Sequence, residues 1–311
     1  MQYHHIPVMV KEVIGYLGCS PGKTYVDGTL GGGGHAQAIL RVIGPNGFLI
    51  GMDRDPDAIA GARRYLRDFK SNVQFVNENF IFIPEVLSQS NTRGVDGILL
   101  DLGLSLYQLE GSGRGFSFMR DEPLDMRMNP EEENTAEAIV NRFSEKELAD
   151  LIARYGEDPW AMRIAKGIVR ARRRARIRST SQLAEIVKEA IPARHRPRRI
   201  NPATRTFQAL RIAVNQELEC LKVFLGHAAD LLNPKGRLCI ISFHSLEDRI
   251  VKQHLKALAR GCDCPPDFPV CVCGKKPQVR ILTKRPARPD PAEIKANPMA
   301  RSAKLRAAER L

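Results

Sequence analysis

The chain has 311 residues, with 48 Lys and Arg against 35 Asp and Glu, so its net charge is +13. With 27% charged and 43% hydrophobic residues, the composition is typical of a packed protein and argues against a disordered chain. No run approaches the ~18 consecutive apolar residues of a membrane-spanning helix, and we expect no secretory signal. Seven cysteines, an odd number, argue against a disulfide scaffold, so we expect a cytoplasmic protein.

The first hundred residues alternate between strand and helix patterns. Short apolar runs predict strands at residues 24–27, 47–53, 73–76 and 95–102. Strands that alternate with helices predict a parallel sheet with helices on its faces. The pattern returns near the C-terminus, where an apolar strand, a helix and a last strand are predicted at residues 237–243, 245–258 and 279–283.

The middle of the chain has no strand pattern. A capping box of Ser144 and Glu147 opens one predicted helix, and Asp158-Pro159 predicts the start of the next. We therefore expect one α/β domain of residues 1–110 and 207–311, interrupted by a helical insertion at residues 111–206. This insertion is the predicted RNA-recognition domain.

One predicted helix lies at the C-terminal border of the insertion. It begins at Asn201-Pro202, and its apolar residues from Phe207 to Leu221 keep helical spacing. Because most of these positions come after residue 206, we expect this helix to pack in the α/β domain.

The positive charge is concentrated in two parts of the chain. Residues 163–211 contain 15 Lys or Arg and two acids, and residues 275–311 contain 11 Lys or Arg and three acids. Two basic blocks indicate a polyanionic partner, and solvated arginine-rich helix faces are the alternative. The residues that we expect to contact RNA are Arg170, Arg172, Arg173, Arg174 and Arg205.

A glycine-rich loop directly follows the first predicted strand. Val26–His35 reads VDGTLGGGGH, and such a turn lets the backbone approach a ligand closely while the next helix points N–H groups at it. Asp53 stands at the end of the second strand, where a carboxylate can accept hydrogen bonds from both ribose hydroxyls of an adenosine-containing cofactor. The alternative is an ordinary tight turn with a surface aspartate.

The spacing of this loop favours one class of cofactor. Dinucleotide sites use G-x-G-x-x-G to hold a pyrophosphate, whereas this loop is closer to D-x-T-x-G-x-G and begins with Asp27. A carboxylate beside the cofactor tail suits a cationic group, so S-adenosylmethionine is favoured over NAD. Phe80, after the third strand, could lie against an adenine ring or belong to the core.

The cysteines offer two further hypotheses. Four of the seven lie close together in the sequence and could hold a structural zinc ion. The two-residue gaps of common zinc ribbons are missing, so we expect a loop without metal. Cys239 lies inside the apolar strand, where we expect a buried thiol rather than a nucleophile. The four clustered cysteines are Cys262, Cys264, Cys271 and Cys273.

Several longer segments follow one another in a fixed order over essentially the whole chain: Asp27–Thr29, Gly33–His35, Asp53–Pro56, Gly97–Gly103, Arg114–Arg120, Pro123–Met128, Pro202–Gln208 and Ser242–Arg249. Together they resemble the bacterial ribosomal small-subunit methyltransferase H family. One departure lies beside the expected site, where the family usually reads D-L-G-V-S-S-P-Q. Here Leu104, Leu106 and Tyr107 replace the valine, the second serine and the proline.

The resemblance implies a class I S-adenosylmethionine-dependent methyltransferase fold with a helical insertion. It implies methylation of the exocyclic N4 of one cytidine in the decoding region of 16S rRNA, with 16S rRNA or the small ribosomal subunit as partner. The cofactor contacts that it implies are Gly33, Gly34, His35, Asp53, Phe80, Asp101 and Gln108.

The expected reaction asks the protein mainly for placement, because the sulfonium methyl group is already activated. Cytosine N4 is a poor nucleophile because its lone pair is delocalised into the ring, so an acceptor for the amino hydrogens would help. The candidates by topology are Asp101, Ser105, Ser242 and His244, and the sequence does not choose among them.

Other functions stay open at this point. The chain could methylate another RNA, or it could be a non-catalytic RNA-binding assembly factor that keeps the cofactor pocket. An NAD-type oxidoreductase is disfavoured by the loop spacing and by the charge of the insertion. The sequence does not give the oligomeric state, or tell naked rRNA from an assembled subunit as substrate.

Overall fold

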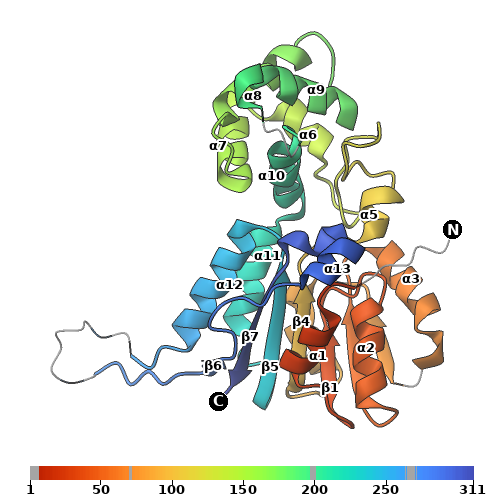
Figure 1. Cartoon of the computed structure of the whole chain (residues 1–311), viewed down its shortest axis with the longest axis vertical. Helices are drawn as coiled ribbons and strands as arrows, with labels where there is room; N and C mark the ends of the chain where they lie inside the picture. Colours follow the sequence, from red (N-terminus) through yellow and green to blue (C-terminus); the bar gives the residue numbers. More distant parts are fainter. Residues whose placement is uncertain (1–6, 70–71, 197–200, 263, 265–269, 271) are drawn as a thin grey trace. The chain divides into compact units, whose positions relative to one another are not determined.

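The computed structural model describes residues 7–69, 72–196, 201–262, 264, 270 and 272–311. The chain divides into two compact units (Figure 1). The helical unit is Leu104–Leu218, and the sheet unit takes the residues up to Gly103 and from Glu219 onward. Within the described ranges, no helix combines the length and the apolar character that a membrane crossing requires.

The sheet unit is built on seven strands in the order β3-β2-β1-β4-β5-β7-β6. The strands from β1 to β5 run parallel to their neighbours, and β7 runs antiparallel to both β5 and β6. Their bounds are β1 Thr24–Asp27, β2 Phe48–Met52, β3 Val73–Val76, β4 Val95–Asp101, β5 Leu232–Ser242, β6 Val279–Ile281 and β7 Lys304–Arg310. All six predicted strands are confirmed, whereas β7 was not predicted.

Alternate residues of each strand face opposite sides of the sheet, so each strand contributes side chains to two hydrophobic cores, one on each face. Tyr25, Leu49 and Leu99 belong to one core, with the helices α1 (Val10–Leu17), α2 (Gly34–Ile43) and α3 (Pro56–Tyr65). The next residue of each strand, such as Val26 or Ile50, belongs to the other core. The helices of that core are α4 (Ile83–Gln89), α11 (Glu217–His227) and α12 (Ser245–Leu258). This is the expected parallel sheet covered on both faces, with a short helix α13 (Pro291–Ala296) before β7.

The helical unit has one core of its own. Its helices bury apolar residues at helical spacing, such as Leu148 and Ile152, Ile164 and Ile168, and Leu183 and Val187. The predicted capping box is confirmed, since the Glu147 N–H donates to Ser144 Oγ at 3.2 Å and the Ser144 N–H to Glu147 Oε2 at 2.7 Å. The helices are α5 Leu106–Glu110, α6 Ala136–Arg142, α7 Glu145–Gly156, α8 Ala161–Arg172, α9 Thr180–Ala190 and α10 Thr204–Asn215.

Two predicted helix bounds were wrong. Asp158 Oδ1 accepts the N–H of Trp160 at 2.9 Å, which forms a turn, and α8 begins only at Ala161. The single helix predicted from Asn201-Pro202 to Leu221 is two helices, α10 and α11, because Gln216 adopts a left-handed conformation with φ of 50°.

The helix α10 lies in the helical unit rather than in the sheet unit. Its residues Phe207, Leu210 and Val214 are buried in the core that α7 and α8 share. For this reason the helical unit spans Leu104–Leu218 and is wider at both ends than the predicted insertion of residues 111–206.

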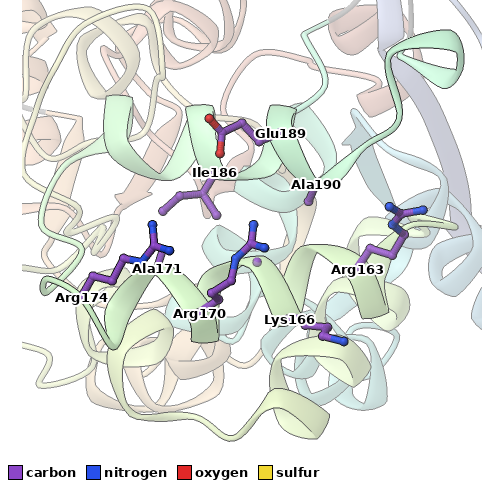
Figure 2. A pocket seen from close by; sticks show the side chains of 9 residues that line it. Arg163, Lys166, Arg170, Ala171, Arg174, Ile186, Glu189 and Ala190 are labelled. Atoms are coloured by element: carbon purple, nitrogen blue, oxygen red, sulfur yellow. The ribbon is translucent and has the colours of Figure 1, made fainter.

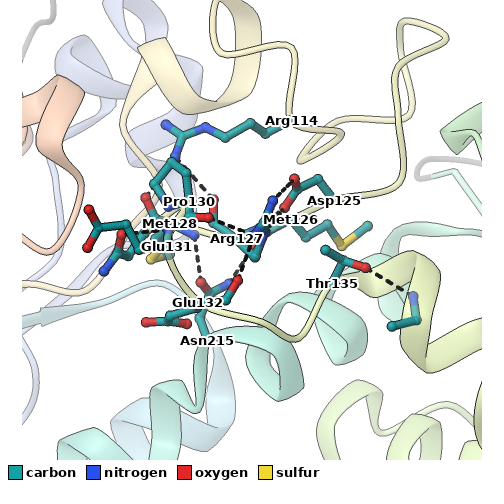
Figure 3. A network of polar contacts seen from close by, with 12 residues as sticks. Arg114, Asp125, Met126, Arg127, Met128, Pro130, Glu131, Glu132, Thr135 and Asn215 are labelled. Atoms are coloured by element: carbon teal, nitrogen blue, oxygen red, sulfur yellow. Dashed lines mark hydrogen bonds and ion pairs between the residues drawn. The ribbon is translucent and has the colours of Figure 1, made fainter.

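The loop before α6 is fixed by a polar network (Figure 3). Asn215, at the end of α10, accepts the Met128 N–H and donates to the Met126 carbonyl, both at 2.8 Å. Arg127 forms two parallel hydrogen bonds of 2.8 Å with Asp125, and its Nη1 donates to two backbone carbonyls of the same loop. The segment Pro123–Met128 therefore stabilises the helical unit by connecting this loop to α10. The same segment carries part of the family resemblance.

Candidate functional site

The glycine-rich loop joins the carboxyl ends of three neighbouring strands. The Gly28 N–H donates to the Leu99 carbonyl of β4 at 2.9 Å, and the Leu30 N–H donates to the Met52 carbonyl of β2 at 2.8 Å. Thr29 Oγ1 accepts the Asp101 N–H at 2.5 Å. The strand order reverses between β1 and β4, and ligands of open α/β sheets bind at such a point, outside the carboxyl ends of the strands.

Close packing explains the glycines of this loop. A Cβ atom on Gly28 would lie 2.5 Å from Leu100 Cδ2, and one on Gly34 would lie 2.9 Å from Pro7 Cγ. Gly33, which precedes α2, has a φ of 84°, a conformation that side chains disfavour. The loop therefore delivers the N-terminus of α2, whose first N–H groups have no partner inside the helix, to the sheet edge.

Two carboxyl groups at this edge have unused oxygens. Asp27 is buried at the end of β1, and Asp101 lies at the end of β4. Asp27 Oδ2 and Asp101 Oδ1 have no hydrogen-bond partner within the described part of the chain. Burial raises the pKa of each carboxyl to about 7. A positively charged ligand group would restore the ionised forms, so the site fits a cationic cofactor.

His35 lies beside one of these carboxyl groups. Its Nε2 donates to the Val8 carbonyl at 2.7 Å, and its Nδ1 lies 3.7 Å from Asp101 Oδ2. Burial lowers the pKa of His35, which keeps the ring neutral with the Nδ1 lone pair toward Asp101.

Asp53 ties two loops together at the end of β2. Its Oδ2 accepts the Gly31 N–H at 2.8 Å, and its Oδ1 accepts the Asp55 N–H at 2.9 Å. Burial raises the pKa of Asp53 to about 6. Each carboxylate oxygen retains a further lone pair that can accept a hydrogen bond. The contact of Asp53 with ribose hydroxyls stays a prediction.

Phe80 follows β3 in a short 3₁₀ turn, Phe80–Phe82. Its ring meets Phe224 edge to face, with 5.7 Å between the centroids, and it packs against the core beneath α4 and α11. Its Cβ lies 3.1 Å from the position that a Cβ of Gly28 would take. The residue therefore supports the glycine loop from the core, and its contact with an adenine ring stays a prediction.

The other candidate acceptors have structural partners. Ser242 Oγ donates to the Lys304 carbonyl at 3.3 Å, and His244 caps α12, with its Nδ1 accepting the Glu247 N–H at 3.4 Å. Ser105 and Gln108 belong to the helical unit, where they form a capping box at the start of α5. In the sheet unit, the structure brings together Asp27, His35, Asp53 and Asp101.

Sequence reasoning missed two links of this cluster. Thr29 was given no role in the site, yet its hydroxyl accepts the backbone N–H of Asp101. His35 was expected to contact the cofactor, and its position beside Asp101 was not foreseen. The signal for Thr29 was its hydroxyl group within the D-x-T-x-G-x-G spacing of the loop.

The helical unit carries a basic groove between α8 and α9 (Figure 2). Its volume is about 450 Å³, and α8 lines it with Arg163, Lys166 and Arg170, followed by Arg174 just after the helix. Gly167 faces Ala190 of α9, where a Cβ would lie 3.5 Å from the alanine Cβ, so the helices approach closely at the floor of the groove. We call these four cationic residues and their cleft the α8–α9 groove.

Only part of the predicted RNA-binding set lines this groove. Arg170 and Arg174 do, and Arg173 is exposed. Arg172 instead donates from Nη1 to the Val140 carbonyl of α6 at 2.7 Å, and Arg205 donates to the Glu157 carbonyl at 3.1 Å. Arg163 and Lys166 were not predicted, although the spacing of the four groove cations by three or four residues marks one helix face.

The thiol of Cys239 is buried as predicted, and burial raises its pKa strongly. It is therefore a poor nucleophile. Cys262, Cys264 and Cys273 lie close together, while Cys271 is outside the described residues.

Comparison with known proteins identifies the family of the chain. The pattern of the MraW methylase family matches residues 2–311. Ribosomal RNA small subunit methyltransferase H of Desulforapulum autotrophicum is 53% identical over 313 residues, and that of Geobacter sulfurreducens is 53% identical over 311 residues; both alignments cover 100% of each chain. The protein of that name from Halothermothrix orenii is 50% identical, over 99% of this chain and 98% of its own. The chain therefore belongs to the MraW methylase family and is a methyltransferase whose methyl donor is S-adenosylmethionine.

Proposed function

We propose that the protein methylates the exocyclic N4 of a cytidine in the decoding region of 16S rRNA, in the cytoplasm. The observation that carries the proposal is a pair of carboxyl groups at the strand ends beside the glycine loop, Asp27 and Asp101, each with one oxygen that has no hydrogen-bond partner in the described part of the chain. They suit a cationic methyl donor and an amino group that must lose a proton. The name shared by the relatives supports rRNA of the small subunit as the substrate.

The proposed cofactor contacts follow from the cluster at the sheet edge. Bound S-adenosylmethionine supplies an electrophilic methyl group on a positively charged sulfur. Asp27 would face its cationic part, Asp53 would accept from the ribose hydroxyls, and the N-terminus of α2 at Gly33, Gly34 and His35 would surround its tail. Phe80 and Gln108 complete the proposed set.

Asp101 is the proposed acceptor for the amino proton of cytosine. A general base works best with a pKa near the working pH, and burial brings the pKa of Asp101 to about 7. Its N–H is held by Thr29 Oγ1 and its Oδ2 faces His35 Nδ1, so the remaining Oδ1 has a fixed direction. Ser105, Ser242 and His244 are less suited, because each already caps a helix or bonds within the sheet.

The RNA would be held by the basic helical unit. The α8–α9 groove presents four cationic side chains, and Glu189 is the acidic residue among the described residues that line it. Arginine and lysine in such an arrangement contact phosphates and fix the register of the RNA without reading its bases. Arg173 extends this basic face outward from the end of α8.

The test is transfer of tritium from labelled S-adenosylmethionine to small-subunit rRNA, followed by digestion and nucleoside analysis. The label is expected in N4-methylcytidine. Label at C5 of cytosine, in another RNA only, or in none would overturn the proposal. Offering naked 16S rRNA and assembled small subunits in parallel identifies the form of the substrate.

A variant sharpens this test. Asp101→Asn keeps the shape of the side chain but removes the base, and it is expected to slow single-turnover transfer by about 10²–10⁴-fold. An unchanged rate would show that Asp101 does not accept the proton. The methylated position would still be identified by the nucleoside analysis.

A further inference from the structure

The long loop between α12 and β6 has an unusual construction. It leaves α12 after Leu258 and returns at Gln278, whose N–H donates to the Leu258 carbonyl at 2.8 Å and closes the base of the loop. Its described residues form no helix or strand. Loops of this length without secondary structure are uncommon unless something else holds them or they serve a function.

This loop does not build an apolar core from its described side chains. Val270 and Val272 are 70% and 74% exposed, although valine is usually buried. The contact near its base is between Gly261 and Pro277, where a Cβ on the glycine would lie 3.1 Å from the proline ring. The two described valines therefore add no buried apolar surface to this loop.

Three cysteine thiols converge within it. The Sγ atoms of Cys262, Cys264 and Cys273 all lie within 4.8 Å of one another, and those of Cys262 and Cys273 are 3.7 Å apart. Zinc binds thiolates at about 2.3 Å in a tetrahedron, which places neighbouring sulfurs about 3.8 Å apart. The spacing of Cys262 and Cys273 matches one edge of that tetrahedron.

The surroundings of these sulfurs suit thiolates. The Cys264 N–H points at Cys262 Sγ with 3.3 Å between N and S, and such a hydrogen bond favours the ionised sulfur. Gly274 follows Cys273 with a φ of 61°, a left-handed conformation that glycine adopts without strain. Two cationic residues, Lys275 and Lys276, come next in the sequence.

We propose that Cys262, Cys264 and Cys273 bind one structural zinc ion that fixes the loop between α12 and β6. Three thiolates occupy three corners of the tetrahedron, and a further ligand or a water molecule takes the fourth. Because a cross-link stabilises more when it closes a long loop, a zinc ion held by these three cysteines would stabilise this loop. The site is separate from the glycine loop, and the proposal does not depend on the function proposed above.

The experiment measures metal in the full-length protein. The chain is purified in reductant without chelators, and its zinc is counted by inductively coupled plasma mass spectrometry, with one zinc per chain expected. Replacement by Co²⁺ is expected to give the thiolate charge-transfer band and the intense visible absorption of a tetrahedral site. Wild-type protein that holds no zinc, both as purified and after incubation with Zn²⁺ and desalting, would overturn the proposal.

Variants separate a ligand from a merely structural cysteine. Cys273 is exposed, so Cys273→Ser should fold normally, as circular dichroism would verify, yet lose the zinc. Cys273→His is expected to retain it, because imidazole also binds zinc. Cys19→Ser, at a half-buried cysteine far from this loop in the sequence, is the matched control and keeps its metal. Full zinc in Cys273→Ser, or its loss in Cys19→Ser, would contradict the assignment.

Discussion

Ionising two carboxyl groups of the candidate site costs free energy in the folded protein, because burial disfavours their charged forms. The pKa of Asp27 and of Asp101 is raised to about 7 by burial, whereas aspartate in an unfolded chain titrates near ~3.9. The folded protein therefore holds protons that the unfolded chain has lost. Without cofactor, the free energy of unfolding should accordingly fall as the pH rises from about 4 through about 7. A cationic cofactor offsets this cost.

The first prediction follows from the same two groups. Affinity for S-adenosylmethionine should rise with pH between about 6 and 8, because at lower pH the cation must displace a proton from Asp27 or Asp101. Each proton displaced weakens binding by up to about tenfold per pH unit below the pKa. Isothermal titration calorimetry in buffers of different ionisation enthalpy would measure both the affinity and the protons released. An affinity independent of pH would mean that neither carboxyl faces the cation.

The second prediction concerns Asp53. Asp53→Ala should weaken cofactor binding by about 10²–10⁴-fold, because it removes two charge-assisted hydrogen bonds to the ribose, worth about 1.5–3 kcal/mol each. The same change frees the Gly31 N–H and loosens the glycine loop. Calorimetry with S-adenosylmethionine checks it, and Asp68→Ala, at an exposed acid, is the control. Equal affinities for the two variants would exclude Asp53 from the site.

At the scale of whole elements, local patterns predicted the strands and helices around the glycine loop well. Thr24–Asp27 and Val95–Asp101 are short, apolar and bounded by turn residues. Their length and apolar character were enough to predict them as strands. The cluster at their carboxyl ends followed from topology. The contact between His35 and Asp101 depends on the distance between two side chains, which the sequence pattern does not contain.

The strand β7 escaped prediction because its residues favour a helix. Its sequence KLRAAER is rich in Ala, Arg, Lys and Glu. Its position between β5 and β6 overrides this preference, since it buries Leu305 and Ala307 and pairs on both sides. Its buried charged side chains are neutralised by ion pairs. Arg306 donates to Asp248 at 2.6 Å, and Glu309 accepts from both Arg237 and Arg280. Those partners are distant in the sequence.

The third prediction belongs to the helix α8. Arg170→Glu with Arg174→Glu should weaken RNA binding and leave cofactor affinity unchanged, because both side chains line the α8–α9 groove. For each arginine that no longer binds a phosphate, the slope of log affinity against log salt should fall in magnitude by about 0.7–0.9. Fluorescence anisotropy with an rRNA fragment at several salt concentrations measures both quantities.

A matched control separates this groove from general charge. Arg142→Glu with Lys146→Glu changes the net charge equally at exposed positions of α6 and α7, and it should affect RNA binding less. Equal weakening by both double variants would mean that only the overall charge of the helical unit attracts RNA. Arg172→Ala should act differently again, by lowering thermal stability, because this arginine bonds the Val140 carbonyl.

At the scale of the whole molecule, charge and binding chemistry are divided between the two units. Thirteen more basic than acidic residues lie in residues 163–211, and the three buried or half-buried carboxyl groups Asp27, Asp53 and Asp101 lie in the sheet unit. Each unit has its own apolar core. Apart from Gln108, the proposed cofactor contacts lie in the sheet unit, so the cofactor is expected to stabilise mainly that unit and the RNA phosphates the helical unit.

Hydrogen exchange of backbone amides tests this division in the intact protein. A ligand present at 100 times its dissociation constant stabilises the unit that it binds by about 2.7 kcal/mol, and this slows exchange through opening of that unit by up to about 100-fold. S-adenosylmethionine should therefore protect the amides of Gly28–His35 and Asp53–Asp55, while an rRNA fragment should protect α8 and α9. Protection by RNA confined to residues 275–311 would assign the phosphates to the second basic block instead. In that case the charges of the α8–α9 groove would be an ordinary solvated helix face.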